Sequence, residues 1–197
     1  MLKHSEPADT ALFHQETIVI VGLMGAGKSS VGRRLAHRLE RRFVDSDREI
    51  EDAAGCTISE FFERFGEAEF RRVEQRVIER ILSGSPVVLA TGGGAYMSEE
   101  TRAAIAQKGV SLFLKADIDV LFERVSRRRD RPLLAQKDPK AVLEKLMEER
   151  YPVYEKADLW IESRRGPLAA TVDRVYEVLT DYLARREKLS RHTKPND

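Results

Sequence analysis

The sequence predicts a three-layer α/β domain, with a mostly parallel sheet between two layers of helices. Its apolar runs have strand length and lack alternation, which is typical of strands buried on both faces of a parallel sheet. Segments with helical spacing separate these runs, and such regular alternation favours parallel strands joined by right-handed crossovers. With 197 residues and 42% apolar content, the chain suits one core and is short for two ordinary domains.

The first predicted unit is a strand, a glycine-rich turn and a helix. Residues 17–21 (TIVIV) are predicted to form the strand, because all five are β-branched and polar residues do not alternate with apolar ones. From Lys28 onward the spacing becomes helical, with Val31, Leu35 and Leu39 apolar and charged residues between them. This unit is the first half of a βαβ fold.

A second short strand begins at Phe43 and Val44 and runs into Asp45-Ser46-Asp47. Helical pieces follow and are expected to break at two glycines, Gly55 and Gly66. They cover residues 50–54, 58–65 and 70–82.

Three further strands are predicted at residues 86–90 (PVVLA), 110–114 (VSLFL) and 159–161 (LWI). Residues 127–138 (RRRDRPLLAQKD) are polar and contain a proline between two helical segments, so we expect a mobile excursion there. Helical segments fill the remaining spaces between strands.

The two ends of the chain are expected to lie outside the domain. Residues 1–16 form an N-terminal extension that we expect to be flexible. Residues 17–185 form the domain. Residues 186–197 form a charged C-terminal tail, with fraying expected from Arg185.

Composition excludes several classes of protein. Lys+Arg 34 against Asp+Glu 33 leaves a net charge of +1, so no global field draws the chain to nucleic acid or membrane. No apolar stretch has spanning length, and residues 1–16 lack the pattern of a signal peptide. Cys56 is the single cysteine, which fits a reducing compartment. We therefore expect a cytoplasmic protein.

A phosphate-binding motif carries the first chemical signal. Residues 22–29 (GLMGAGKS) fit the pattern G-x-x-x-x-G-K-[ST] between a predicted strand and a predicted helix, the context that the pattern requires. Glycines let backbone N–H groups face phosphate oxygens, and the helix presents its positive end to the same charge. We expect Lys28 to reach the β- and γ-phosphates and the Ser29 hydroxyl to bind Mg²⁺.

Asp45 and Asp47 lie two residues apart at a strand end, so strand alternation would point both toward the nucleotide crevice. One carboxylate near Mg²⁺ and one near an acceptor hydroxyl would suit phosphoryl transfer. A polar strand end without function is the alternative, and the pair alone leaves it open.

Two segments indicate an anionic acceptor. Residues 70–74 (FRRVE) begin a predicted helix, where arginines oppose the helix dipole unless an anion lies nearby. A solvated charged face is an equal alternative. Residues 92–94 (GGG) follow a buried strand and leave three backbone N–H groups approachable, although a simple flexible turn has the same sequence.

Two arginines stand in less decisive settings. Arg131 lies in the excursion, where a cation could move over a transferring phosphate as a lid closes. A nucleic-acid patch is the alternative there, but the segment lacks interleaved aromatic residues. Arg150 comes near the end of a predicted helix, where it favours the dipole without any ligand.

Together these segments resemble the shikimate kinase family, a group of P-loop kinases of small molecules. The resemblance covers about residues 17–185 and implies a P-loop kinase fold with a five-stranded parallel sheet, helices on both faces and a mobile lid over about 127–137. It rests on six motifs in the family's order, which are GLMGAGKSS (22–30), VDSD (44–47), GEAEFRRVE (66–74), TGGGA (91–95), RPLL (131–134) and ERYPVY (149–154).

The resemblance implies how ATP and Mg²⁺ bind. Asp45 would contact Mg²⁺ through water, beside Ser29. Arg124 and residues 165–167 resemble the adenine slot. The remaining ATP contacts would come from Gly25, Ala26, Gly27, Lys28, Ser29, Ser30 and the lid residue Arg131.

The resemblance also implies an acceptor site. Asp47 would bind the hydroxyls of shikimate and accept the proton, and it would form the catalytic set with Lys28 and Arg131. The shikimate carboxylate would lie between two arginines, Arg71 and Arg150. Backbone donors for the ring hydroxyls would come from Gly93 and Gly94.

The implied reaction is transfer of the γ-phosphoryl group of ATP to shikimate, which gives shikimate 3-phosphate on the route to chorismate and the aromatic amino acids. We expect a monomer with this small-molecule substrate and no nucleic-acid or membrane partner. A kinase of another small hydroxy acid such as gluconate is one alternative, which the FRR and GGG segments disfavour. A nucleotide-binding regulatory module without an acceptor is the other, and it would leave the acceptor arginines without a purpose.

Overall fold

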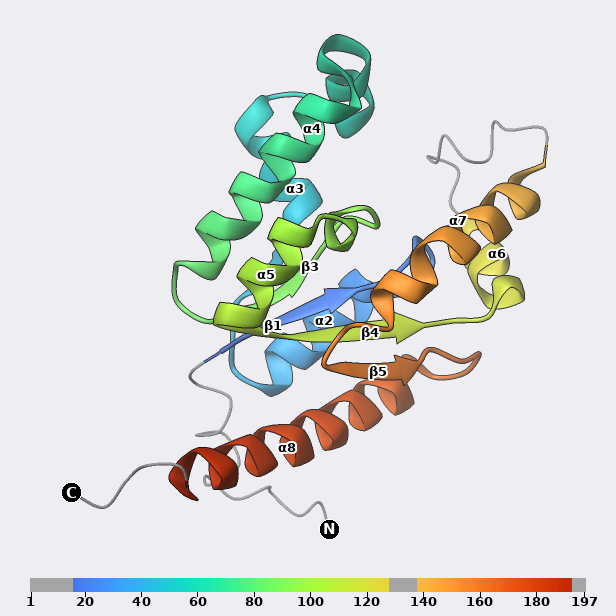
Figure 1. Ribbon diagram of the computed structural model, residues 1–197. Coiled ribbons are helices and arrows are strands. Elements are labelled where there is room, and N and C mark those ends of the chain that lie inside the picture. Colours follow the sequence, from blue (N-terminus) through green and yellow to red (C-terminus); the bar gives the residue numbers. More distant parts are fainter. Residues whose placement is uncertain (1–15, 128–137, 193–197) are drawn as a thin grey trace.

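The computed structural model describes residues 16–127 and 138–192, which build one five-stranded sheet in the order β2-β3-β1-β4-β5 (Figure 1). Every pairing in it is parallel. The predicted α/β class and parallel sheet are therefore confirmed. The strands are β1 (Thr17–Val21), β2 (Phe43–Asp45), β3 (Val88–Ala90), β4 (Gly109–Lys115) and β5 (Leu159–Glu162).

The centre of the sheet is buried on both faces. All residues of β1 are buried, as are those of β4 up to Leu114. In the register, Val19 of β1 lies between Leu89 of β3 and Ser111 of β4. This burial explains why the strand sequences show apolar runs rather than alternation.

Helices cover both faces of the sheet. On one face α2 (Lys28–Arg38) packs against β1, β2 and β3, and α8 (Leu168–His192) packs against α2 and β5. The opposite face carries α5 (Glu99–Lys108) and the short helix η1 (Ala95–Met97), with α7 (Pro139–Tyr154) against η1 (Figure 1). Helix α6 (Ile118–Ser126) packs against α7.

A pair of helices projects from the sheet beyond β2 (Figure 1). Helices α3 (Ser46–Ala54) and α4 (Ile58–Leu82) pack on each other around a small apolar cluster of their own. Gly55 ends α3 in the left-handed region, with φ 65°. Gly66 interrupts α4 with φ 77° and ψ 171°. The predicted breaks at both glycines are thus confirmed.

The C-terminal helix departs from the sequence-based expectation. Helix α8 continues to His192, so the tail boundary expected at residue 186 falls inside this helix. Arg186 pairs with Glu16 at 2.8 Å, and the Glu16 carbonyl also accepts a hydrogen bond from Arg41 at 2.6 Å. The Arg186 contact ties α8 to the segment just before β1, and the Arg41 contact ties that segment to the loop after α2.

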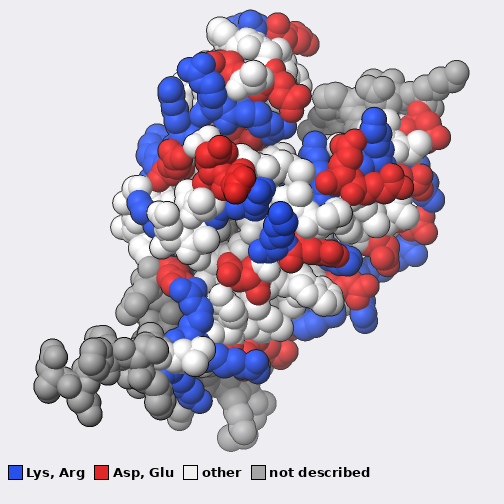
Figure 2. Space-filling view, viewed as in Figure 1, with Lys and Arg blue, Asp and Glu red and all other residues white. Residues whose placement is uncertain are grey.

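The surface carries charges of both signs. Figure 2 shows Lys and Arg side chains interspersed with Asp and Glu over the face in view, in keeping with the net charge of +1. Within the described residues, no helix combines the length and the apolar character that crossing a membrane requires. Most of the lid expected over about residues 127–137 lies outside the described residues.

Candidate active site

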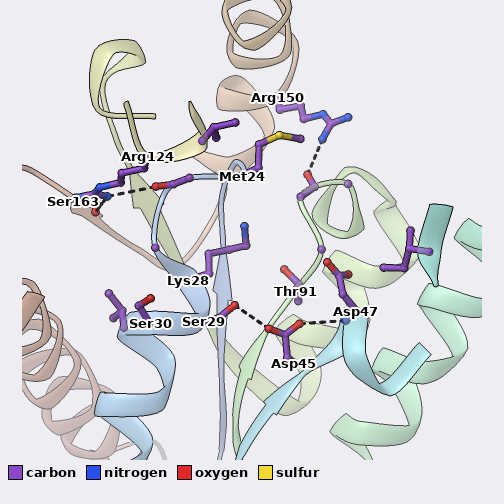
Figure 3. A pocket seen from close by; sticks show the side chains of 18 of the residues that line it. Met24, Lys28, Ser29, Ser30, Asp45, Asp47, Thr91, Arg124, Arg150 and Ser163 are labelled. Atoms are coloured by element: carbon purple, nitrogen blue, oxygen red, sulfur yellow. Dashed lines mark hydrogen bonds between the residues drawn. The ribbon is translucent and has the colours of Figure 1, made fainter. Parts of the chain in front are cut away.

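A cavity of about 640 Å³ opens at the carboxyl ends of the strands (Figure 3). Four strands contribute to its wall through the residues that follow them. In a parallel α/β sheet this edge is where ligands bind. The contributing segments include Met24 to Val31 except Ala26 after β1, Asp45 at the end of β2 with Asp47 beyond it, Thr91 to Gly94 after β3, and Ser163 after β5.

The loop between β1 and α2 forms the floor of the cavity. Gly27 caps α2 with φ 100°, a left-handed conformation that suits glycine, and the first turn of α2 holds no acidic residue. The positive end of the helix is therefore left for an anion. Lys28 lies beside it and donates hydrogen bonds to the carbonyls of Gly22 at 2.8 Å and Leu23 at 3.1 Å.

Ser29 and Asp45 bring two oxygen ligands together beside this loop. The Ser29 hydroxyl donates to Asp45 Oδ2 at 2.8 Å, and Asp45 Oδ1 accepts from the backbone N–H of Asp47 at 3.3 Å (Figure 3). Asp45 therefore caps α3 and at the same time faces the phosphate-binding loop. Among the side chains of residues 16–127 and 138–189, no three His, Cys, Asp or Glu groups gather as a metal cluster.

Asp47 lines the cavity from a helix, so strand alternation does not explain its orientation. Strand β2 ends at Asp45, and Asp47 is already in the first turn of α3. The predicted reason for the common orientation of the two carboxylates is thus wrong, although both line the cavity. Figure 3 shows both side chains directed into the cavity, Lys28 from the start of α2 and Asp47 from the start of α3.

Arg71 enters the cavity from α4 and is held by two acids on the same helix. Its Nη1 donates to Glu74 Oε2 at 2.6 Å, and its Nη2 donates to Glu67 at 3.0 Å. It lies five residues after the break at Gly66, beyond the helix start where the sequence placed it. The alternative interpretation of this segment, a solvated charged face, applies to Arg72, whose side chain is 63% exposed and pairs with Glu69.

Two carboxylates, the half-buried one of Asp47 and the buried one of Glu74, face each other across Gly92. A β-carbon at Gly92 would lie 2.6 Å from both Asp47 Oδ1 and Glu74 Oε1, so a larger residue there would displace these carboxylates. Glu74 is 2% exposed, and its Oε1 has no hydrogen-bond partner among the described residues. Burial, followed by the charge of Asp45, raises the pKa of Asp47. Burial is also the main cause that raises the pKa of Glu74.

The three-glycine loop after β3 connects the two helical walls of the cavity. The N–H of Gly92 donates to Ser46 Oγ at 3.1 Å, so this amide is not available, unlike the sequence-based expectation for all three. On one side, a β-carbon at Gly94 would lie 2.5 Å from the Arg71 guanidinium. On the other, Arg150 Nη1 donates to the Gly93 carbonyl at 3.0 Å.

Arg124 and Ser163 tie the phosphate-binding loop to the end of β5. Arg124 Nη1 donates to Ser163 Oγ at 2.8 Å and to the Ala26 carbonyl at 3.2 Å. The Ser163 hydroxyl donates to the same carbonyl at 2.8 Å. Arg124 and Gly166 both line the cavity, whereas contact of this region with adenine stays a prediction.

One cavity thus brings together most of the residues predicted from the sequence. They are the phosphate-binding residues Gly25 to Ser30, the carboxylates Asp45 and Asp47, the arginines Arg71 and Arg150, and the glycine loop. Ala26 is the exception, because it is fully buried in the phosphate-binding loop. Arg131 lies outside the described residues. Glu74 and Ser163 were missed as site residues. Glu74 left a signal, because it is an acid at helical spacing among the apolar residues of α4, and Ser163 left none.

Comparisons with known proteins agree with this geometry. A family model described as shikimate kinase matches residues 24–180. A shikimate kinase from Bradyrhizobium diazoefficiens is 58% identical over 167 residues, which are 85% of this chain and 81% of the relative. The solved structure of the Acinetobacter baumannii shikimate kinase in complex with shikimate aligns with a TM-score of 0.81 at 35% identity, over 94% of this chain and 99% of that one.

A more distant structure bears on the fold alone. A gluconokinase from Sinorhizobium meliloti aligns with a TM-score of 0.57 at 22% identity, over 92% of this chain and 99% of that one. The fold is therefore shared with proteins outside the shikimate kinase family.

Proposed function

The chain belongs to the shikimate kinase family, and we propose that the cavity at its strand ends transfers the γ-phosphoryl group of ATP to shikimate. The product is shikimate 3-phosphate. The alternative acceptor, gluconate, has no such support, because the gluconokinase structure is 22% identical and shares only the fold.

One observation carries the proposal. Arg71 from α4 and Arg150 from α7 flank the same glycine loop, within the cavity that also contains the phosphate-binding loop. Two guanidinium groups can bind a carboxylate by charge-assisted hydrogen bonds. An acid acceptor bound there would present its hydroxyls to Asp47, whose Oδ1 lies beside Gly92 of the same loop and which lines the cavity together with Lys28. A regulatory nucleotide module has no need of such an acceptor pocket.

The residues act mainly by positioning and by charge. Lys28 exchanges its bonds to loop carbonyls for the β- and γ-phosphates and offsets the charge that develops on them. Asp47 orients the acceptor hydroxyl and accepts its proton. The charge of Lys28 opposes the upward shift of the Asp47 pKa, so the phosphate lysine also helps to keep the base ionised.

The site fits Mg²⁺. Ser29 and Asp45 place a hydroxyl and a carboxylate oxygen within 2.8 Å of each other beside the phosphate-binding loop. Mg²⁺ prefers hard oxygen ligands, and in phosphoryl-transfer sites it takes few from the protein because phosphates and waters supply the rest. When bound, the ion would neutralise charge on the transferred group. Ser29 and Asp45 would hold it, Asp45 through water.

An ADP-release assay with an acceptor panel tests the function. We expect ATP turnover that depends on shikimate and remains at background with gluconate or without an acceptor. Acceptor-independent turnover would support the regulatory module, and turnover with gluconate would support the related kinase.

Other expectations stay proposals. Arg131 as the lid cation, and the lid expected over about 127–137 apart from residue 127, fall on residues that the structure does not describe. Location in the cytoplasm has the support of the single Cys56 and of the ATP that the reaction uses. A monomer is the simplest state, since one chain supplies both halves of the cavity.

A further inference from the structure

The carbonyl of Gly93 accepts two hydrogen bonds from one helix. Arg150 Nη1 donates to it at 3.0 Å, and the hydroxyl of Tyr154 donates to the same oxygen. Arg150 and Tyr154 are four residues apart on α7, so they lie on one helix face and reach the same point. The glycine loop is thus fixed by a second residue besides the arginine that faces the acceptor.

Tyr154 is built into the core and is well suited to this contact. It is 1% exposed, and its ring packs near those of Phe113, at 5.2 Å between centroids, and Tyr96, at 6.4 Å. Burial raises the pKa of Tyr154 to about 12. The hydroxyl therefore keeps its proton at neutral pH and remains a donor.

The hydrogen bonds to the Gly93 carbonyl also fix the direction of the Gly94 N–H, because both groups belong to one peptide unit. In a planar trans peptide the carbonyl oxygen of Gly93 and the N–H of Gly94 point in opposite directions. A carbonyl directed at α7 therefore directs the Gly94 N–H away from α7. The loop also abuts the phosphate-binding loop, since a β-carbon at Gly93 would lie 3.8 Å from the Gly22 carbonyl and 3.9 Å from the Met24 nitrogen.

We propose that Tyr154 is a positioning residue for the acceptor, which holds the Gly93 carbonyl so that the Gly94 N–H is presented to a substrate hydroxyl. This inference rests on the proposed function. Arg150 has five N–H donors and can bind a substrate carboxylate while Tyr154 keeps the loop in place. The hydroxyl of Tyr154 acts through the loop and does not itself touch the substrate.

The chain offers a matched control in Tyr151. It lies on the same helix, is 8% exposed, and its hydroxyl donates to a backbone carbonyl, that of Ala116, at 2.5 Å. Ala116 precedes α6 and does not line the cavity. Tyr154→Phe and Tyr151→Phe each remove one buried hydroxyl and leave the packed ring, so both are expected to fold, which a thermal melt checks.

We expect Tyr154→Phe to raise the KM for shikimate about 3- to 10-fold, as the loss of one such hydrogen bond implies, with the KM for ATP within about 2-fold of wild type. Tyr151→Phe should leave both constants within about 2-fold. In hydrogen–deuterium exchange, a peptide that covers residues 91–95 should exchange faster in Tyr154→Phe alone. Equal effects of the two variants, or an unchanged shikimate KM in Tyr154→Phe, would overturn the proposal.

The outcome is separable from a failure of the proposed function. If wild type shows no shikimate-dependent turnover, the function itself is wrong. If wild type turns over shikimate and Tyr154→Phe keeps its KM and its exchange rate, only the role of Tyr154 is wrong.

Discussion

The hydroxyl of Ser29 donates a hydrogen bond of 2.8 Å to Asp45, sixteen residues further along the chain. Ser29 belongs to the first turn of α2, and Asp45 ends β2. The bond joins the ATP side of the cavity to the strand that leads to Asp47. It also points to different roles for the two carboxylates, because Asp45 contacts Ser29 directly whereas Asp47 lines the cavity beside Gly92.

This separation predicts different responses to Mg²⁺. Asp45→Asn should raise the Mg²⁺ concentration needed for half-maximal turnover, because it removes one negative charge beside Ser29. Asp47→Asn should lower kcat about 10²- to 10⁴-fold, the range for loss of a general base, and leave ATP·Mg²⁺ binding nearly unchanged. Steady-state kinetics over a Mg²⁺ titration checks both. Rescue of Asp47→Asn by added Mg²⁺ would contradict the assignment.

Lys28→Ala should lower kcat at least about 100-fold without loss of the fold. Lys28 is bound to the carbonyls of its own loop and lines the cavity, so the substitution leaves the core intact. Turnover and a thermal melt measure the two effects. Lys115→Ala is the control, since Lys115 pairs with Glu155 at the surface at 2.8 Å and should retain activity. Turnover of Lys28→Ala within a few-fold of wild type would remove the basis for the phosphate-binding role.

Local features of the fold and site could be predicted from the sequence. The strands, the glycine breaks and the loop before Lys28 depend on short-range sequence, which fixes backbone conformation within a few residues. The pairing of Ser163 with Ala26 could not be predicted, because it joins residues 137 positions apart and serine is common at strand ends. Strand alternation predicts that Asp47 faces the cavity, but this reason is wrong. Asp45 ends β2 and caps α3, so Asp47 lies in the first turn of a helix.

Arg71→Leu and Arg150→Leu should each raise the KM for shikimate about 10- to 100-fold and affect the KM for ATP much less, because each removes a charge-assisted contact. Only Arg71→Leu should also lower the thermal midpoint. It leaves Glu74, whose side chain is 3% exposed, without its partner at 2.6 Å, at a cost of about 1–3 kcal/mol. Steady-state kinetics and calorimetry test the pattern. Equal rises in both KM values would count against a carboxylate site.

The stability of the unliganded protein should carry a pH dependence from Asp47. Its pKa is raised above the ordinary value of 3.8, so the folded state binds the proton more tightly than the unfolded state. The stabilisation is present below pH 3.8 and is lost as the pH rises through the folded pKa. The free energy of unfolding of wild type relative to Asp47→Asn should therefore fall with rising pH, as urea titrations can measure. A relative gain of wild type over that range would contradict burial as the cause.

Ser163 and Ser111 are both buried serines whose hydroxyls donate strong hydrogen bonds, and they differ in where these bonds lead. Ser163 Oγ donates to the Ala26 carbonyl at 2.8 Å and accepts from Arg124, whereas Ser111 Oγ donates to Asp158 at 2.6 Å, away from the cavity. The two residues are 3% and 2% exposed. Substitutions of the two serines therefore form a matched pair, which tests whether the hydroxyl of Ser163 affects ATP binding.

Ser163→Ala should raise the KM for ATP about 3- to 10-fold, because the phosphate-binding loop loses one hydrogen bond and Arg124 loses a partner, while the KM for shikimate stays within about 2-fold. Ser163→Thr keeps the hydroxyl and should recover most of the affinity. Ser111→Ala should lower the thermal midpoint and leave both KM values unchanged. If Ser163→Ala instead raises the shikimate KM, or if Ser111→Ala raises the ATP KM equally, then Ser163 stabilises the fold in general and has no particular part in holding the loop for ATP.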